Sequence, residues 1–98
     1  MSAENIYLIM TYEVAPENHS AFVTAFNKLI VKSLTEDDGC MWYSMTKSTE
    51  TENTFKLIER WRDQASLDAH STSPSMDPYR AEIGPLVGTA HKEVLTAV

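Results

Sequence analysis

The stretch ERWRDQASLDAH, residues 59–70, joins the end of one expected β-strand to the helix that follows it. Residues 54–61 are predicted to be a strand because their side chains alternate, with one face carrying Phe55, Leu57, Glu59 and Trp61. Asp63 is typical of a helix N-cap, and we expect a short helix to run from it through His70. A strand ending in Glu-x-Trp and a helix ending in Ala-His therefore place an acid, an aromatic ring and a histidine on adjacent elements.

Five further segments extend this interpretation to the whole chain. Residues 6–14 and 41–47 are rich in β-branched and aromatic residues and are predicted strands, and residues 90–98 form a last strand. Residues 17–34 show apolar spacing of three and four and predict an amphipathic helix, and a further helix is expected from Pro74 or Ser75 to Ile83. The order β-α-β-β-α-α-β predicts an α+β, ferredoxin-like split β-α-β fold with a four-stranded antiparallel sheet. We expect residues 1–98 to form a single domain.

Both faces of this expected sheet carry apolar side chains. In residues 6–12, one face holds Ile6, Leu8, Met10 and Tyr12, and the other holds Tyr7 and Ile9. The helices can cover only one face, and a second copy of the chain is the simplest cover for the other. We therefore expect a homodimer.

Charge and composition narrow the range of partners. The net charge is -6, with 14 acidic and 8 basic residues and no basic cluster, which disfavours a nucleic-acid partner. No stretch approaches the roughly 18 apolar residues of a membrane helix, and the first residues, MSAENIYLIM, do not resemble a signal peptide. The single cysteine, Cys40, cannot form an intrachain disulfide. We expect a cytoplasmic protein without a membrane or nucleic-acid partner.

The histidines do not predict a metal site. His19, His70 and His91 are not spaced at helical intervals from one another, and the cysteine has no near partner. We expect His19 to be solvated and His91 to be polar at an edge strand. His70 shares a helix face with Leu67, which is expected to face the sheet, so His70 is either a core or capping residue or a catalytic group.

Glu59 and Trp61 each have two interpretations. An acid on an apolar strand face is either buried and paired, with Arg60, Arg62 or a base of the partner subunit, or lines a cavity. Trp61 is either a core aromatic whose indole N–H needs an acceptor or part of a pocket wall. The chain lacks a Gly-rich phosphate loop, a nucleophile elbow and a Cys-x-x-Cys motif, which disfavours nucleotide, flavin and serine-nucleophile chemistry.

Three segments together resemble the antibiotic biosynthesis monooxygenase (ABM) family, especially its quinol-monooxygenase-like members. They are GCMWYSM at residues 39–45, FKLIERWRDQASLDAHSTSPSM at residues 55–76 and the helix that contains Tyr79. The resemblance implies a dimeric α+β barrel with a pocket between the sheet and helices of each subunit. It also implies oxidation of a small aromatic or quinol-like substrate by O₂ with no metal, flavin or haem.

The resemblance also implies roles for individual residues. His70 would accept or orient a proton, Glu59 would support the site as a second catalytic residue, and Trp61 would be an aromatic wall. Asn5 and Tyr79 would contribute to substrate binding.

Two departures from the family pattern bear on the chemistry. Many members have a histidine where this chain has Ser75. The haem-degrading branch has a tryptophan in place of His70 and its haem-ligating histidine in place of Arg80, which disfavours haem degradation.

Two classes of function follow from the sequence. The first is a cofactor-independent monooxygenase acting on a quinol-like or polyphenolic aromatic. The alternative is a non-oxidative isomerase of a small carbonyl compound, or a small-ligand-binding protein, on the same dimeric barrel. Both classes need the same pocket and a similar base, so the sequence does not separate them.

Overall fold

The computed structural model describes residues 4–98, and its elements follow the predicted order. The strands are β1 (Ile6–Glu13), β2 (Cys40–Lys47), β3 (Thr54–Trp61) and β4 (Thr89–Thr96), and the helices are α1 (His19–Glu36), α2 (Gln64–Thr72) and α3 (Asp77–Ile83). Three short 3-10 helices lie at Pro16–Asn18, Pro74–Met76 and Gly84–Leu86. Each has a proline in its first turn, where a backbone N–H would have no hydrogen-bond partner within the helix. Within this described range, none of the helices has the length and apolar character needed to cross a membrane.

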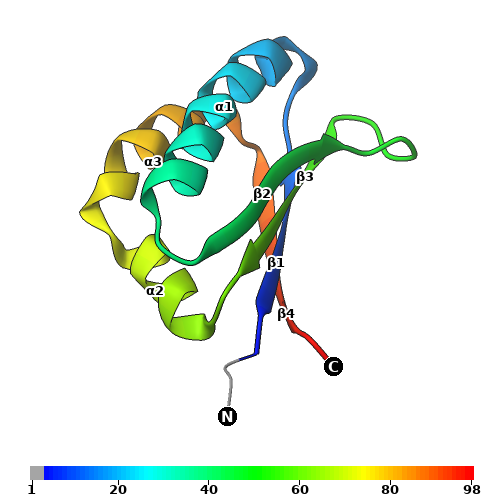
Figure 1. The fold of residues 1–98 in the computed structure, drawn as a ribbon. Coiled ribbons are helices and arrows are strands. Elements are labelled where there is room, and N and C mark those ends of the chain that lie inside the picture. Colours follow the sequence, from blue (N-terminus) through cyan, green and yellow to red (C-terminus); the bar gives the residue numbers. More distant parts are fainter. Residues whose placement is uncertain (1–3) are drawn as a thin grey trace.

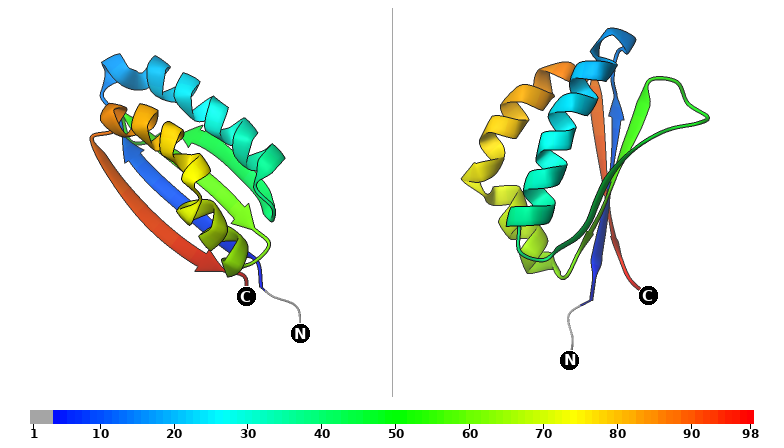
Figure 2. Two further views of the ribbon diagram at one scale, coloured as in Figure 1. Left: turned by 90° about the vertical axis from the view of Figure 1, so that its left-hand side faces the viewer. Right: turned by 45° about the horizontal axis from the view of Figure 1, so that its top comes forward.

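The four strands form one antiparallel sheet in the order β2-β3-β1-β4. All three helices lie on the same side of it, as Figures 1 and 2 show. The two central strands, β1 and β3, pair along their full length from Ile6 opposite Trp61 to Glu13 opposite Thr54. This arrangement confirms the predicted ferredoxin-like fold.

The core fills the space between the sheet and the helices. It contains the predicted inward face of β3, in which the exposed fractions of Phe55, Leu57 and Trp61 are 4%, 1% and 0%. Phe22 of α1 contacts Phe55, and their ring centroids are 5.1 Å apart. Burying a side chain of this size contributes about 1.5–3 kcal/mol, so these contacts fix α1 on the sheet.

His19 differs from its expected place on the solvated surface. Its Nε2 is 2.8 Å from the carbonyl oxygen of Val14, and its ring packs edge-on against Phe55 with centroids 5.0 Å apart. His19 therefore anchors the start of α1 to the end of β1.

None of the helices in residues 4–98 covers the opposite face of the sheet (Figure 2). By register, this outer face carries Tyr7, Ile9, Trp42, Ile58 and Leu95, of which Trp42, Ile58 and Leu95 are exposed. Apolar side chains on an uncovered sheet face are typical of an interface. The homodimer stays a prediction, now attached to a defined surface.

Candidate active site

A cavity of about 530 Å³ lies between the sheet and the helices, within the usual size range of small-molecule sites. Its apolar lining comes from strands and helices alike and includes Leu8, Met10, Leu29, Leu57 and Ile83. Its large polar side chains are Tyr12, Tyr43, Glu59, His70, Arg80 and Lys92. The cavity thus combines an apolar body with groups that can transfer protons, and the two predicted catalytic residues both reach it.

His70 reaches the cavity because α2 begins at a fixed place and presents one face to the sheet. The Asp63 carboxylate caps the helix by accepting a hydrogen bond from the backbone N–H of Ser66, at 2.8 Å. Three residues on the inward face, Ser66, Leu67 and His70, are then buried. The exposed fraction of His70 is 6%, as expected for a residue that shares the face of Leu67.

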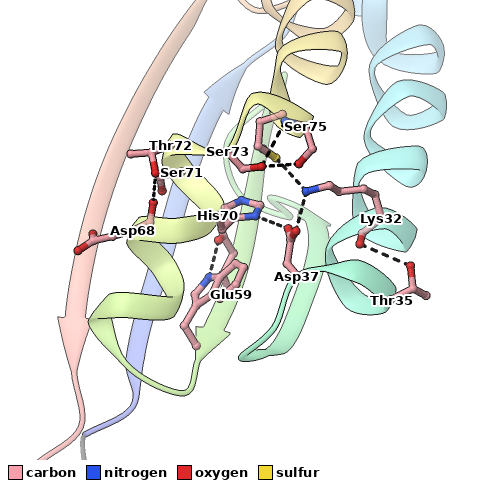
Figure 3. Close-up of polar contacts among 12 residues, drawn as sticks. Lys32, Thr35, Asp37, Glu59, Asp68, His70, Ser71, Thr72, Ser73 and Ser75 are labelled. Atoms are coloured by element: carbon pink, nitrogen blue, oxygen red, sulfur yellow. Dashed lines mark hydrogen bonds and ion pairs between the residues drawn. The ribbon is translucent and has the colours of Figure 1, made fainter.

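A chain of polar contacts fixes the His70 ring. Its Nδ1 is 2.5 Å from one carboxylate oxygen of Asp37, and the other oxygen accepts a hydrogen bond from the Lys32 ammonium at 2.6 Å. Figure 3 shows the Asp37 carboxylate between the imidazole and the ammonium. Lys32 is itself buried, with an exposed fraction of 4%. Asp37 therefore fixes one ring nitrogen and leaves Nε2 free.

The charges and burial around His70 favour a neutral imidazole. Burial lowers the pKa of His70, and the Asp37 carboxylate offsets this only in part. Burial alone would raise the pKa of Asp37, but hydrogen bonds from Lys32 and His70 hold it below its ordinary value. An ionised Asp37 selects the tautomer in which Nδ1 donates, so Nε2 carries the lone pair of a base.

The turn after α1 places Asp37 within reach of α2. Gly39 adopts a positive φ of 86°, and its carbonyl accepts a hydrogen bond from the backbone N–H of Arg62 at 2.8 Å. A Cβ at Gly39 would lie 2.3 Å from the Ser66 hydroxyl oxygen. Glycine is required here both for the backbone conformation and for the close approach of the α2 N-terminus.

Glu59 is the second buried ionisable group in the cavity. Its exposed fraction is 3%, and Oε1 accepts a hydrogen bond from the Trp61 indole N–H at 2.8 Å. Burial raises the pKa of Glu59 from 4.5 to about 7, although this indole bond and the charge of Lys92 counteract the rise. A carboxyl group of this kind can donate a proton near neutral pH.

The expected arginine partners of Glu59 bind other groups. The Arg60 guanidinium donates to the side-chain oxygen of Asn5, with its Nε at 2.9 Å, and Arg62 pairs with Asp38 at 3.1 Å. Glu59 therefore lines the cavity without a salt bridge to either arginine.

The structure places the three predicted substrate-binding residues outside the cavity lining. Trp61 is fully buried behind it, where its ring packs on His70 with centroids 4.6 Å apart. Asn5 binds Arg60 and the backbone carbonyl of Arg62 at the start of β1, and Tyr79 packs against the core without reaching the cavity surface. Trp61 thus differs from the expected wall, because its N–H points at Glu59 and its ring supports the imidazole from behind.

The sequence prediction did not include five polar residues of the site: Lys32, Asp37, Tyr12, Tyr43 and Lys92. The sequence pattern could have identified Lys32 as a buried, paired residue. It follows Leu29 by three residues on the apolar face of α1, where a lysine requires a partner. Asp37 has no such pattern, because it lies between α1 and β2 in a turn without periodicity. Burial raises the pKa of both tyrosines above the ordinary range, so each phenol stays protonated.

No group of three or more His, Cys, Asp or Glu residues within residues 4–98 is arranged to hold a metal ion. Ser75 hydrogen-bonds to Ser73 at 2.7 Å and lies outside the cavity. The two predicted catalytic residues, His70 and Glu59, both line the cavity.

The chain matches a protein-family model and several known proteins in sequence and in structure. The family model described as antibiotic biosynthesis monooxygenase matches residues 5–82. Rv0793 from Mycobacterium tuberculosis is 30% identical over 82 residues, covering 84% of this chain and 79% of the relative, and its solved structure superposes with a TM-score of 0.84.

Two further solved structures share the fold. One, from Caulobacter crescentus CB15 and named for the same family, is 27% identical, covers 98% of this chain and 92% of its own, and has a TM-score of 0.92. The other, SnoaB from Streptomyces nogalater, a cofactor-independent oxygenase, is 16% identical, covers 97% and 94%, and has a TM-score of 0.86. At that identity SnoaB supports the fold alone.

Proposed function

The chain belongs to the antibiotic biosynthesis monooxygenase family, and from that membership we propose that it oxidises a small quinol-like or polyphenolic aromatic with O₂ without a metal, flavin or haem. The observation that carries the proposal is the pairing of two buried proton-transfer groups in one apolar cavity. Nε2 of His70 is the proposed base, and the carboxyl of Glu59 is the proposed acid. Opposite perturbation of two neighbouring titratable groups is typical of an acid–base pair.

The proposed reaction needs no external reductant. A quinol-like substrate loses its hydroxyl proton to Nε2 of His70, and the resulting phenolate passes an electron to O₂ more readily than the neutral phenol does. Combination of the two radicals at a ring carbon gives a hydroperoxide, and cleavage of its O–O bond leaves one oxygen in the product and releases the other as water. The substrate supplies all four electrons that reduce O₂, and two of its hydrogens complete the water.

The chain's own residues contribute position and proton transfer. Asp37 and Lys32 hold the imidazole in the basic tautomer, which is the role of an orienting carboxylate beside a histidine base. Glu59 can return a proton to the departing oxygen, since burial raises the pKa of its carboxyl to about 7. The apolar walls keep water away from a radical or peroxide intermediate.

Oxygen consumption tests the proposal directly. Purified protein is assayed with an oxygen electrode against quinols and polycyclic phenols, with and without a chelator. His70→Gln, which keeps a hydrogen-bonding group but not the basicity, should lower the rate about 10²–10⁴-fold. His91→Gln, the same change at an exposed position on β4, is the matched control and should leave the rate unaltered.

Two results would refute the proposal. One is oxygen uptake that does not exceed background with any substrate of the panel while a small carbonyl compound is isomerised, which would establish the alternative class. The other is uptake that requires added flavin or iron.

A further inference from the structure

The charge of the cavity lining is opposite to that of the whole chain. The chain has 14 acidic and 8 basic residues, whereas the lining contains two bases, Arg80 and Lys92, and one acid, Glu59. Burial raises the pKa of Glu59 to about 7, so this acid carries only part of a negative charge at neutral pH. The cavity is therefore a locally cationic region on an acidic protein.

The two bases lie at the open side of the cavity, and the acid–base pair lies at its inner side. Arg80 is on α3 with a side chain 51% exposed, and Lys92 is on the exposed strand β4. Glu59 and His70 are only 3% and 6% exposed. A ligand that reaches from the inner groups toward these exposed residues would have the two cations beside its outer end.

Both cations retain capacity to bind an anion. Lys92 forms no ion pair with any residue in the range 4–98. The Arg80 guanidinium donates from one Nη to the backbone carbonyl of Ser71 at 2.5 Å, and its other Nη is 4.0 Å from Asp77, which leaves further N–H groups free. An arginine with free N–H groups and an unpaired lysine are suited to a carboxylate.

We propose that the substrate of this cavity is an aromatic carboxylic acid, with its rings among the apolar walls and its carboxylate between Arg80 and Lys92 at the opening. This inference rests on the proposed function only for the statement that the bound molecule is a substrate. Its oxidisable hydroxyl would lie inward, toward His70 and Glu59. A carboxylate fits better than a phosphate, because the sequence has no Gly-rich phosphate loop to supply backbone N–H groups.

The test is equilibrium binding of two probes of equal shape, 2-naphthoate and 2-naphthamide, measured by calorimetry at pH 7 with the intact protein. The naphthoate should bind about fivefold or more tightly, which is the effect of one to two partly exposed charge pairs. Raising the salt from 0.05 to 0.5 M should largely abolish the preference, because exposed charges are screened.

Variants then assign the preference to the opening. Lys92→Met should reduce the ratio of the two affinities toward one, and Lys92→Arg, which keeps the charge, should restore it. Lys47→Met removes the same charge from an exposed position outside the cavity and should preserve the ratio. Circular dichroism of each variant establishes that the fold is intact.

Equal affinity for the two probes, no binding of either at millimolar concentration, or a preference that survives Lys92→Met combined with Arg80→Met would overturn the inference. These outcomes are independent of oxygen consumption. A protein that prefers the carboxylate but consumes no O₂ would refute the proposed function and uphold this inference. A protein that consumes O₂ but binds the two probes equally would uphold the proposed function and refute this inference.

Discussion

Replacing Glu59 by glutamine should stabilise the protein, and only above about pH 5. Glutamine keeps a side-chain oxygen that can accept the Trp61 indole hydrogen bond, and it removes the cost of ionising a buried carboxyl. The pKa of Glu59 is about 7 in the folded chain, against 4.5 as its ordinary value. That difference corresponds to about 3 kcal/mol.

The sign follows from proton binding. Between about pH 4.5 and 7 the folded chain holds the Glu59 proton and the unfolded chain releases it, so wild-type stability falls as the pH rises through this range. As the pH rises past 7 the folded chain also ionises, and the loss is nearly complete by about pH 8. The variant has no such loss, so its advantage should be near zero at pH 4.5 and should reach about 3 kcal/mol at pH 8.

Urea denaturation of both proteins at a series of pH values and one protein concentration measures the difference. His70 and Asp37 titrate in both proteins, so subtracting the wild-type curve largely removes their contribution. Glu50→Gln, in the exposed loop between β2 and β3, is the matched control and should show no comparable pH dependence. A difference that does not change with pH, or a variant less stable than wild type at pH 8, would refute the reasoning about Glu59.

Three other predictions follow from the structure. Asp37→Ala should lower the free energy of unfolding by about 3–5 kcal/mol, because it leaves the buried Lys32 unpaired, and adding Lys32→Met should recover most of the loss in urea denaturation. Gly39→Ala should cost about 1–3 kcal/mol from its positive φ and the clash with Ser66, measured as a lower Tm, whereas Gly84→Ala, where a Cβ meets nothing within 4 Å, should have little effect. Sedimentation should show a dimer at micromolar concentration, with roughly 1,600 Å² buried in total across the outer sheet faces. A stable monomer would refute the predicted dimeric barrel.

The local patterns predicted the fold well because each depends on neighbouring residues alone. The alternation in residues 54–61 identified the inward face of β3, since successive side chains of a strand point to opposite faces. Leu67 by itself was enough to orient α2, and with it His70, once the Asp63 cap fixed where the helix begins. Capping and periodicity are properties of a few adjacent residues, so sequence alone expresses them.

The depth of each side chain and its distant partners could not be predicted in this way. Asp37 lies 33 residues before His70, and their contact exists only because the Gly39 turn packs on the start of α2. Glu59 and Trp61 share a strand face, but Glu59 lines the cavity whereas Trp61 lies behind it and packs on His70 of α2. Pairings of this kind arise from tertiary packing, which no short pattern encodes.

The exposed edge strand β4 forms one outer wall of the cavity. Among residues 4–98, β4 is hydrogen-bonded within the sheet to β1 alone, and it lines the cavity through Ala90 and Lys92. Edge segments of this kind open by local fluctuations that leave the central strands intact. A ligand held by Lys92 would link β4 to the rest of the protein and reduce its local opening. Binding in the cavity should therefore slow amide hydrogen exchange along residues 89–96, with no change expected in β3.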